Sequence, residues 1–329
     1  MLSKDDIKGL CVMAPTPCKE NAQDWRVADS VELNESARMT ENYIQAGVGS
    51  IAACGTTGEC AALLWEEKLQ FIDTVVQVNR KRVPIFAGAT ALGTKEVVRQ
   101  MRELQKIGAD GAFVGLPLWQ TPSLETSVRF FADLSEAVPD FPIMVYSNSM
   151  FFKSDFPTAF WEGVAKRAPT VIITKLTYPF LNILNDLKVA GHRINFMPGE
   201  SQILSVYKMT RPGGVSAIWS SGWAGMGVEP LVALADAILK DDEAKVEAIW
   251  ADFESLPTSV PAGEFYLFPR YNVQVNRWAA NAAAFIKASP TRAPYYLDDL
   301  PVSWKNQAER HAAAWNELRK KYARLTAGK

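Results

Sequence analysis

Short apolar runs alternate with amphipathic segments along the first two thirds of this chain. The runs are too short for buried helices, whereas the segments between them repeat apolar residues at helical spacing. The expected strands are residues 9–13, 50–54, 83–87, 111–116, 142–146, 171–177, 194–197 and 215–219. The expected helices between them include residues 34–46, 66–80, 94–107, 123–137, 157–167 and 180–189. Helices that separate strands imply parallel crossovers and therefore an α/β fold.

Eight strand and helix units are the number that closes a (β/α)8 TIM barrel, which is the predicted fold. The alternative is an open, doubly wound sheet, which needs a glycine-rich turn after its first strand. That turn is Ala14-Pro15-Thr16-Pro17 here, so the barrel is favoured. Beyond residue 228 only helices are expected, at 230–239, 242–253 and 304–325. We therefore predict a barrel with the active site over residues 1–228 and a C-terminal helical part over residues 229–329.

Charge and cysteine content narrow the class of partner. Lys and Arg number 35 against 36 Asp and Glu, so no long-range field attracts nucleic acid or an anionic membrane. Small-molecule partners are therefore expected. The four cysteines have neither metal-ligand spacing nor a neighbouring histidine, which argues against a metal or a disulfide framework and favours a reducing cytoplasm. They are Cys11, Cys18, Cys54 and Cys60.

Lys175 lies inside the apolar run 171–177, which is expected to be a buried strand. Removing a lysine from water disfavours the ammonium and lowers the pKa, which makes the amine a nucleophile toward carbonyl carbon. Such chemistry forms a Schiff base. The alternative is an ordinary strand-end lysine whose head group extends to water.

Two other expected strand ends carry polar residues that suit the same chemistry. Residues 55–59, Gly-Thr-Thr-Gly-Glu, form a turn whose glycines allow close backbone approach and whose hydroxyls and amides could hold a carboxylate. A glycine-rich turn without a ligand is the other interpretation. Tyr146 ends the strand before that of Lys175, and a phenol there could pass protons to and from an imine intermediate. Alone, Tyr146 could equally be part of the barrel wall.

Together, the Gly55–Glu59 turn, Tyr146 and Lys175 resemble the pyruvate-dependent class I aldolases of the dihydrodipicolinate synthase and N-acetylneuraminate lyase family. The similarity extends over nearly the whole chain. It implies that Lys175 forms the imine with a 2-oxo acid, that Tyr146 relays protons, and that Thr56 and Thr57 bind the pyruvate carboxylate. It also implies a homotetramer and a lysine–pyruvate Schiff base that needs no metal and no organic cofactor.

Departures from the family pattern favour an aromatic substrate. Trp119 stands where the synthase has a relay tyrosine, and Phe151 stands where it has an arginine for a carboxylate, followed by Phe152. Aromatic residues in place of a charge indicate an apolar acceptor pocket, although they could simply be core.

Further segments around Tyr146–Asn148, Ile218–Gly222 and Tyr271–Asn272 are similar to the hydratase-aldolases that cleave benzylidenepyruvates in the degradation of aromatic hydrocarbons. That resemblance implies that Asn148, Trp219 and Asn272 line the pocket around the added water and the arene. The expected products are an aromatic aldehyde and pyruvate. The alternatives are another family lyase, synthase or dehydratase acting on a sugar acid or a dicarboxylate, and a pyruvate-binding barrel without turnover.

Overall fold

The computed structural model describes residues 1–117, 119–177, 182–288 and 290–326. Its strands form one parallel sheet in the order β7-β6-β5-β4-β3-β2-β1-β8. The strands are β1 (Gly9–Met13), β2 (Ser50–Ala53), β3 (Ile85–Gly88), β4 (Gly111–Val114), β5 (Ile143–Ser147), β6 (Val171–Leu176), β7 (Asn195–Met197) and β8 (Ala217–Ser220). Each lies within two residues of its expected bounds, so the predicted strand set is confirmed.

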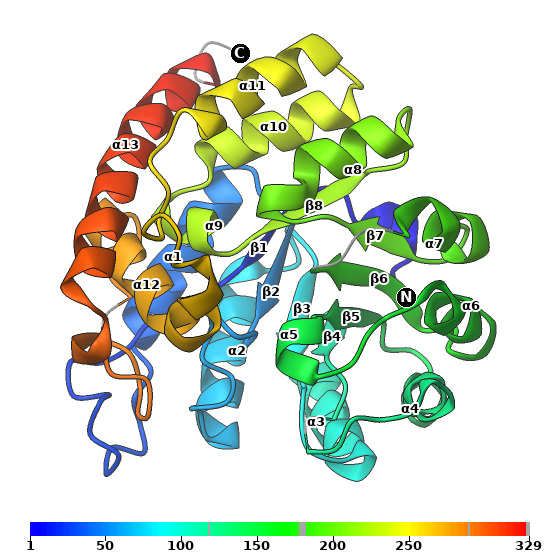
Figure 1. Cartoon of the computed structure of the whole chain (residues 1–329). Coiled ribbons are helices and arrows are strands. Elements are labelled where there is room, and N and C mark those ends of the chain that lie inside the picture. Colours follow the sequence, from blue (N-terminus) through cyan, green and yellow to red (C-terminus); the bar gives the residue numbers. More distant parts are fainter. Residues whose placement is uncertain (118, 178–181, 289, 327–329) are drawn as a thin grey trace.

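The sheet closes into a barrel where its two edge strands meet. Gly199, just beyond β7, forms a parallel bridge with Trp219 of β8, and the Trp219 amide donates to the Pro198 carbonyl over 2.9 Å. Almost every strand residue is buried, as strands covered by helices on one side and by barrel side chains on the other must be. Figure 1 shows the strands at the centre with helices around them. The predicted (β/α)8 barrel is confirmed.

The helices that surround the strands follow the apolar spacing of the sequence. They are α1 (Leu33–Gln45), α2 (Trp65–Asn79), α3 (Thr94–Lys106), α4 (Leu124–Ala137), α6 (Thr158–Arg167), α7 (Ile183–Ala190), α8 (Ile203–Thr210) and α10 (Glu229–Leu239). Side-chain caps fix some of their starts: the Ser123 hydroxyl accepts from the Thr126 amide over 3.1 Å at the start of α4. The expected helix over 180–189 begins later, at Ile183, and residues 178–181 lie outside the described part of the chain.

The C-terminal region is helical, as predicted, but it contains one more long helix than expected. After α10 this region contains α11 (Glu243–Glu254), α12 (Phe268–Ala283) and α13 (Val302–Thr326). Two short helices, α5 (Ser149–Phe152) and α9 (Gly222–Met226), lie in strand-to-helix connections of the barrel. Neither α12 nor α5 was expected, and α12 packs against both α9 and α13. In Figure 1, α12 and α13 lie on one side of the barrel.

Helix α10 begins just after residue 228, the predicted boundary between the barrel and the C-terminal helical part. It follows that division in the sequence, yet it packs against β1 and β8 and therefore covers barrel strands. The described helices include none that is both long and apolar enough to cross a lipid bilayer.

Candidate active site

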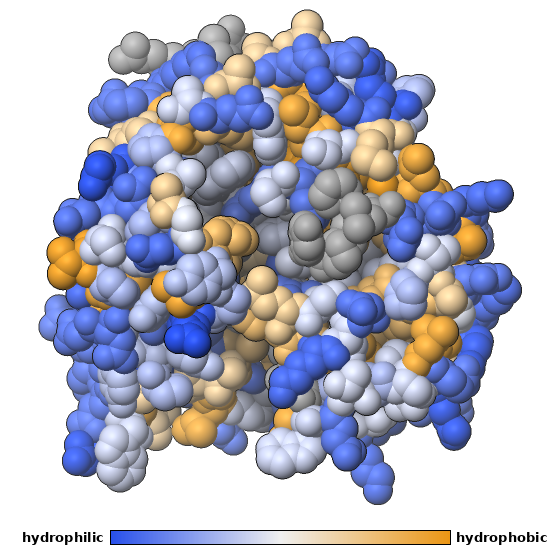
Figure 2. All heavy atoms as spheres, viewed as in Figure 1, coloured by the Kyte–Doolittle hydropathy of each residue, from blue (hydrophilic) through white to orange (hydrophobic). Residues whose placement is uncertain are grey.

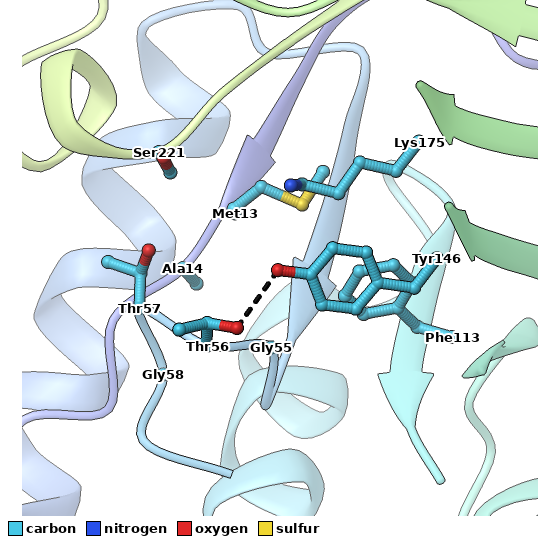
Figure 3. Close-up of a pocket in the computed structure, with 10 residues that line it drawn as sticks. All are labelled: Met13, Ala14, Gly55, Thr56, Thr57, Gly58, Phe113, Tyr146, Lys175 and Ser221. Carbon is cyan, nitrogen blue, oxygen red and sulfur yellow. Dashed lines mark hydrogen bonds between the residues drawn. The ribbon is translucent and has the colours of Figure 1, made fainter. Parts of the chain in front are cut away.

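Lys175 and Tyr146 lie side by side at the carboxyl ends of β6 and β5. They are direct partners in the register of the two parallel strands, and each side chain is only 5% exposed. The carboxyl ends of barrel strands are where such folds place their active sites. Figure 3 shows both side chains pointing into one cavity toward the turn after β2. The structure thus brings together the lysine, the phenol and the turn that the sequence singled out.

The Lys175 amine lies between two aromatic rings. Its Nζ is 3.5 Å from the centroid of the Trp219 ring and 4.5 Å from that of Tyr146, and it donates to Thr177 Oγ1 over 3.3 Å. Burial lowers the pKa of Lys175 to about 7, and the charge of Glu200 partly opposes that shift. A large fraction of the amine is therefore neutral and nucleophilic near neutral pH.

The Tyr146 phenol is held in a protonated state and a fixed orientation. Its hydroxyl lies 2.9 Å from Thr56 Oγ1, while its ring stacks on Phe113 at 4.7 Å and meets Phe152 edge-on at 5.1 Å between centroids. Burial raises the pKa of Tyr146, and hydrogen bonds with Thr56 and Asn148 reduce that shift. The group is thus a proton donor that needs a partner such as Thr56 to pass protons on.

The turn after β2 forms the opposite wall of the cavity. A Cβ on Gly55 would lie 2.9 Å from the Phe113 ring, and one on Gly58 would lie 3.0 Å from the Ala14 carbonyl oxygen, so a larger residue at either position would crowd its neighbours. Among the described residues, none accepts a hydrogen bond from the backbone amides of Thr57 or Gly58. Thr56 and Thr57 line the same cavity. Hydroxyls and unpaired amides in one concave turn can bind a carboxylate.

The described residues that line this cavity come from six barrel strands or from the turns after them. They are Met13, Ala14, Gly55, Thr56, Thr57, Gly58, Phe113, Tyr146, Lys175 and Ser221. Figure 2 shows a hollow near the middle of this face of the molecule, with hydrophilic side chains over much of the surrounding surface.

Trp219 and Asn148, both predicted to line the substrate pocket, lie close to the reactive pair. The Trp219 indole nitrogen donates to the Leu176 carbonyl over 2.7 Å, which fixes the ring against the lysine amine. Asn148 is buried after β5, and its side-chain oxygen accepts from the amides of Met150 and Phe151 over 3.0 and 3.1 Å. Its NH2 group is therefore the part of the amide that remains to donate toward Tyr146 or a bound molecule.

Asn272 belongs to α12 and is not among the described residues that line the cavity. It is half-buried and lies one turn from Asn276, whose NH2 group donates to Asn272 Oδ1 over 3.4 Å. Asn276 in turn approaches Gly222, because a Cβ on that glycine would lie 2.5 Å from Asn276 Oδ1. Gly222 follows the cavity residue Ser221. The side-chain amides of Asn272 and Asn276 therefore lie toward β8. Asn276 was not predicted to be a site residue.

The three aromatic residues predicted for the acceptor pocket occupy different environments. Phe152 is buried, and its ring fills the space where a Cβ on Gly115 would lie, beside Tyr146. Phe151 is half-buried in the short helix α5. Trp119 is 82% exposed in the β4–α4 connection. Phe152 thus supports the Tyr146 ring, whereas Trp119 lies at the surface.

Sequence reasoning missed the partners of two carboxylates at this end of the barrel, the half-buried Glu200 and the buried Glu59. Glu200, just after β7, accepts hydrogen bonds from Ser220 Oγ at 2.8 Å, the Ser221 amide at 2.7 Å and the Trp223 amide at 3.3 Å. Glu59, the last residue of the turn motif, is paired with two arginines of the C-terminal region. The position of Glu200 directly after an expected strand was the available signal for the first. Nothing local in the sequence indicated the arginines.

The fold and the site define a (β/α)8-barrel protein with a buried, neutralisable lysine on its sixth strand beside a phenol on its fifth. A family model described as the Dihydrodipicolinate synthetase family matches residues 24–250, and the chain belongs to that family. The resemblance inferred from the turn, Tyr146 and Lys175 is confirmed.

Relatives within the family share nearly the full length of the chain. A trans-O-hydroxybenzylidenepyruvate hydratase-aldolase of Pseudomonas aeruginosa is 39% identical over 98% of this chain and 96% of its own. A trans-2'-carboxybenzalpyruvate hydratase-aldolase of Nocardioides sp. (strain KP7) is 31% identical over 96% of this chain and 95% of its own. A solved structure of PhdJ bound to a substrate intermediate is 32% identical, covers 98% of this chain and 99% of that chain, and has a TM-score of 0.91.

Proposed function

We propose that this protein is a lyase, a hydratase-aldolase that converts a substituted benzylidenepyruvate and water into an aromatic aldehyde and pyruvate. The observation that carries the proposal is the register pairing of Lys175 with Tyr146, whose hydroxyl lies 2.9 Å from Thr56. Support comes from full-length relatives that are named for this reaction, with hydroxy- and carboxy-substituted substrates.

The first step is imine formation by Lys175. The neutral amine attacks the C2 carbonyl of the substrate, and the carbonyl oxygen leaves as water once protonated, which gives a protonated imine conjugated with the alkene. Thr56 and Thr57, with the amides of their turn, hold the substrate carboxylate. The new cation lies where the amine now lies, between the rings of Trp219 and Tyr146, and cation–π attraction favours it there.

Hydration and cleavage then use the imine as an electron sink. Water adds to the benzylic carbon while the alkene electrons move into the imine, and the resulting enamine takes a proton at C3. Loss of the proton from the new hydroxyl breaks the C3–C4 bond, releases the aldehyde and returns the electrons to nitrogen. Protonation of this second enamine and hydrolysis by water yield pyruvate and free Lys175. Tyr146 relays these protons with Thr56.

The remaining predicted residues serve the acceptor half. Asn148 and Asn272 orient the added water and the developing hydroxyl through their amides, and Trp219 faces the conjugated system. Phe151, Phe152 and Trp119 form the aromatic side on which the arene packs, with Phe152 acting through Tyr146 and Trp119 at the rim. The lysine imine itself supplies the electron sink, so we propose that no metal or organic cofactor takes part. A homotetramer is proposed from family resemblance, and a reducing cytoplasm from the free cysteines.

A substrate panel tests the reaction. Purified protein is incubated with aryl-substituted 2-oxobut-3-enoates, and pyruvate and aldehyde are each measured. We expect equal amounts of both products and a preference for aryl substrates of at least about a hundredfold in kcat/KM. Polyhydroxylated or carboxylated chains would leave hydrogen-bonding groups unpaired against aromatic walls. Equal or better kcat/KM with N-acetylneuraminate, 2-keto-3-deoxygluconate or aspartate semialdehyde plus pyruvate would remove the aryl assignment.

A further inference from the structure

We infer that Arg277 and Arg292, two buried arginines of the C-terminal region, are positioning residues for the turn that binds the oxo-acid carboxylate. They act on the turn through Glu59 and Thr16. This inference rests on the proposed function, because it assumes that the Gly55–Gly58 turn is the carboxylate site. It assigns to the C-terminal region a part in substrate binding that neither the strands nor the family motif requires.

The cluster is fully buried and densely hydrogen-bonded. The Glu59 side chain is 0% exposed, and those of Arg277 and Arg292 are 1% and 3% exposed. Glu59 Oε2 accepts from the guanidinium of Arg277 and, over 2.7 Å, from that of Arg292, while Glu59 Oε1 accepts from the Arg292 amide over 2.7 Å. The Cys18 thiol, whose pKa is raised to about 11 by burial, donates to the same carboxylate at 3.6 Å. Every ionised member therefore has a charged partner, as burial of charge demands.

A second set of hydrogen bonds connects the arginines to the turn itself. Arg277 and Arg292 donate to the Thr16 carbonyl oxygen over 3.0 and 3.1 Å, and the Thr16 hydroxyl donates to the Gly58 carbonyl oxygen over 2.9 Å. The peptide between Gly58 and Glu59 is thus held from both sides. The Thr16 hydroxyl restrains the Gly58 carbonyl, and the two arginines restrain the Glu59 side chain.

The backbone of the turn requires such a restraint. Glu59 has a φ of +54° and Cys54 has a φ of +55°, so non-glycine residues in the left-handed region flank the turn on both sides. That conformation costs free energy for a residue with a Cβ and persists only where surrounding contacts impose it. The ion pairs of Glu59 impose it here. In this conformation the amides of Thr57 and Gly58 donate to no other described residue, in a turn that lines the cavity.

The carboxylate of the oxo acid is therefore bound by a turn whose geometry depends on contacts with the C-terminal region. Arg277 belongs to α12, and Arg292 follows it in the connection to α13. Neither arginine lines the cavity that contains Lys175. Their effect is on the affinity of the turn for a carboxylate and not on proton transfer at Tyr146. A positioning role thus predicts weaker binding of the oxo acid with nearly unchanged chemistry once it is bound.

Titration of Lys175 with pyruvate and borohydride measures that affinity without the complete reaction. Reduction traps the imine, and the pyruvate concentration that gives half-maximal labelling is compared among variants of the full chain. Arg277→Lys keeps a charge but loses the branched guanidinium, and Thr16→Val removes the hydroxyl that holds Gly58 while leaving the ion cluster intact. We expect both to raise the half-saturating pyruvate concentration by about tenfold or more, the scale of one lost buried hydrogen bond. The maximal extent of labelling should change less than about twofold.

Arg319→Lys is the matched control. Arg319 is also an arginine of the C-terminal region, and it forms a bidentate ion pair with Glu229 in which both hydrogen bonds measure 2.8 Å. That pair joins α13 to α10 and does not contact the turn. The Arg319→Lys variant should have a lower melting temperature but an unchanged half-saturating pyruvate concentration. If Arg277→Lys and Thr16→Val only lower the melting temperature, like the control, the arginines merely brace the fold and the inference is wrong. If the wild-type chain takes no label at all, the proposed Schiff base fails instead, so the two failures are distinguishable.

Discussion

The two halves of the site differ in how they are held. On the oxo-acid side, Lys175, Tyr146 and the Gly55–Gly58 turn are fixed by strand register, aromatic packing and buried hydrogen bonds. On the acceptor side, Trp119 is exposed, Phe151 is half-buried in a short helix, and Asn272 comes from α12. Lys175 and Tyr146 lie on barrel strands, whereas the acceptor side is built from connections and an added helix.

This difference separates chemistry from specificity. The bond-making groups must keep their geometry within a fraction of an ångström, which strands with fixed neighbours provide. The arene needs only a fitting apolar surface, and connections can supply that surface in many shapes. We therefore expect changes on the oxo-acid side to reduce turnover strongly for every substrate, and changes on the acceptor side to alter preference among substrates mildly.

The largest expected effect is that of removing the amine. Lys175→Met fits a similar buried volume but cannot form an imine, so turnover should fall by at least about 10⁴-fold, the scale of losing a covalent nucleophile. Borohydride reduction with pyruvate should then add no mass to the peptide that contains residue 175. The exposed Lys153→Met variant is the control and should keep full labelling. A label found on Lys153 in the wild-type chain would refute the assignment.

Loss of the phenol hydroxyl should be the next largest effect. Tyr146→Phe keeps the ring packing with Phe113 and Phe152 but removes the proton relay, and turnover should fall by roughly 10²-fold or more. Steady-state kinetics and a melting curve measure the two consequences separately. Tyr207→Phe is the matched control, because that buried phenol donates to Asp241 elsewhere in the molecule. Unchanged turnover in Tyr146→Phe would exclude a relay through this residue.

Below about pH 7, kcat/KM should fall about tenfold for each unit by which the pH is lowered. Burial lowers the pKa of Lys175 to about 7, so below that pH the protonated form, which cannot attack a carbonyl, predominates. The logarithm of kcat/KM should therefore rise with pH and level off above about 7. Glu200→Gln should move the midpoint to lower pH, because the charge of Glu200 raises the pKa of Lys175. Asn272→Ala, on the acceptor side, should leave the midpoint in place; equal shifts in both variants would contradict this.

The smallest effect is expected at the rim. Trp119→Ala should change the free energy of unfolding by less than about 0.5 kcal/mol, because the side chain is exposed and little packing is lost. We expect KM for an aryl substrate to rise no more than about threefold, since rim contacts contribute little to binding. Chemical denaturation and substrate titration check both values. A rise of about tenfold or more would show that Trp119 closes over the arene and that the acceptor half is more ordered than its exposure indicates.

The barrel and the reactive pair could be predicted from sequence because both depend on local pattern. An apolar run predicts a strand, and consecutive strands of a barrel are neighbours, so Tyr146 and Lys175 at successive strand ends had to meet. The side-chain directions of Phe152 and Trp119 were not predictable, because they follow from a short helix and an irregular connection.

The arginines were beyond prediction for a different reason. Residues 268–283 are rich in Asn, Gln and Arg, which weakens the apolar pattern from which α12 could be predicted. No helix was expected over residues 290–301, which contain Arg292. The partners of Glu59 lie 218 and 233 residues further along the chain. No spacing rule connects groups so far apart, and only the packed fold brings them together.

The pairing of Glu59 with two late arginines also has a consequence for the order of events during synthesis. Thr16 and Glu59 are made early, whereas Arg277 and Arg292 are made near the end. While the last third of the chain is still missing, Glu59 lacks both arginine partners, and of the two restraints on the turn only the hydrogen bond from Thr16 to Gly58 can form. All eight strands can be complete at that stage. We therefore expect a nascent barrel with its lysine in place to bind the oxo acid tightly only after α12 and the connection that carries Arg292 have docked.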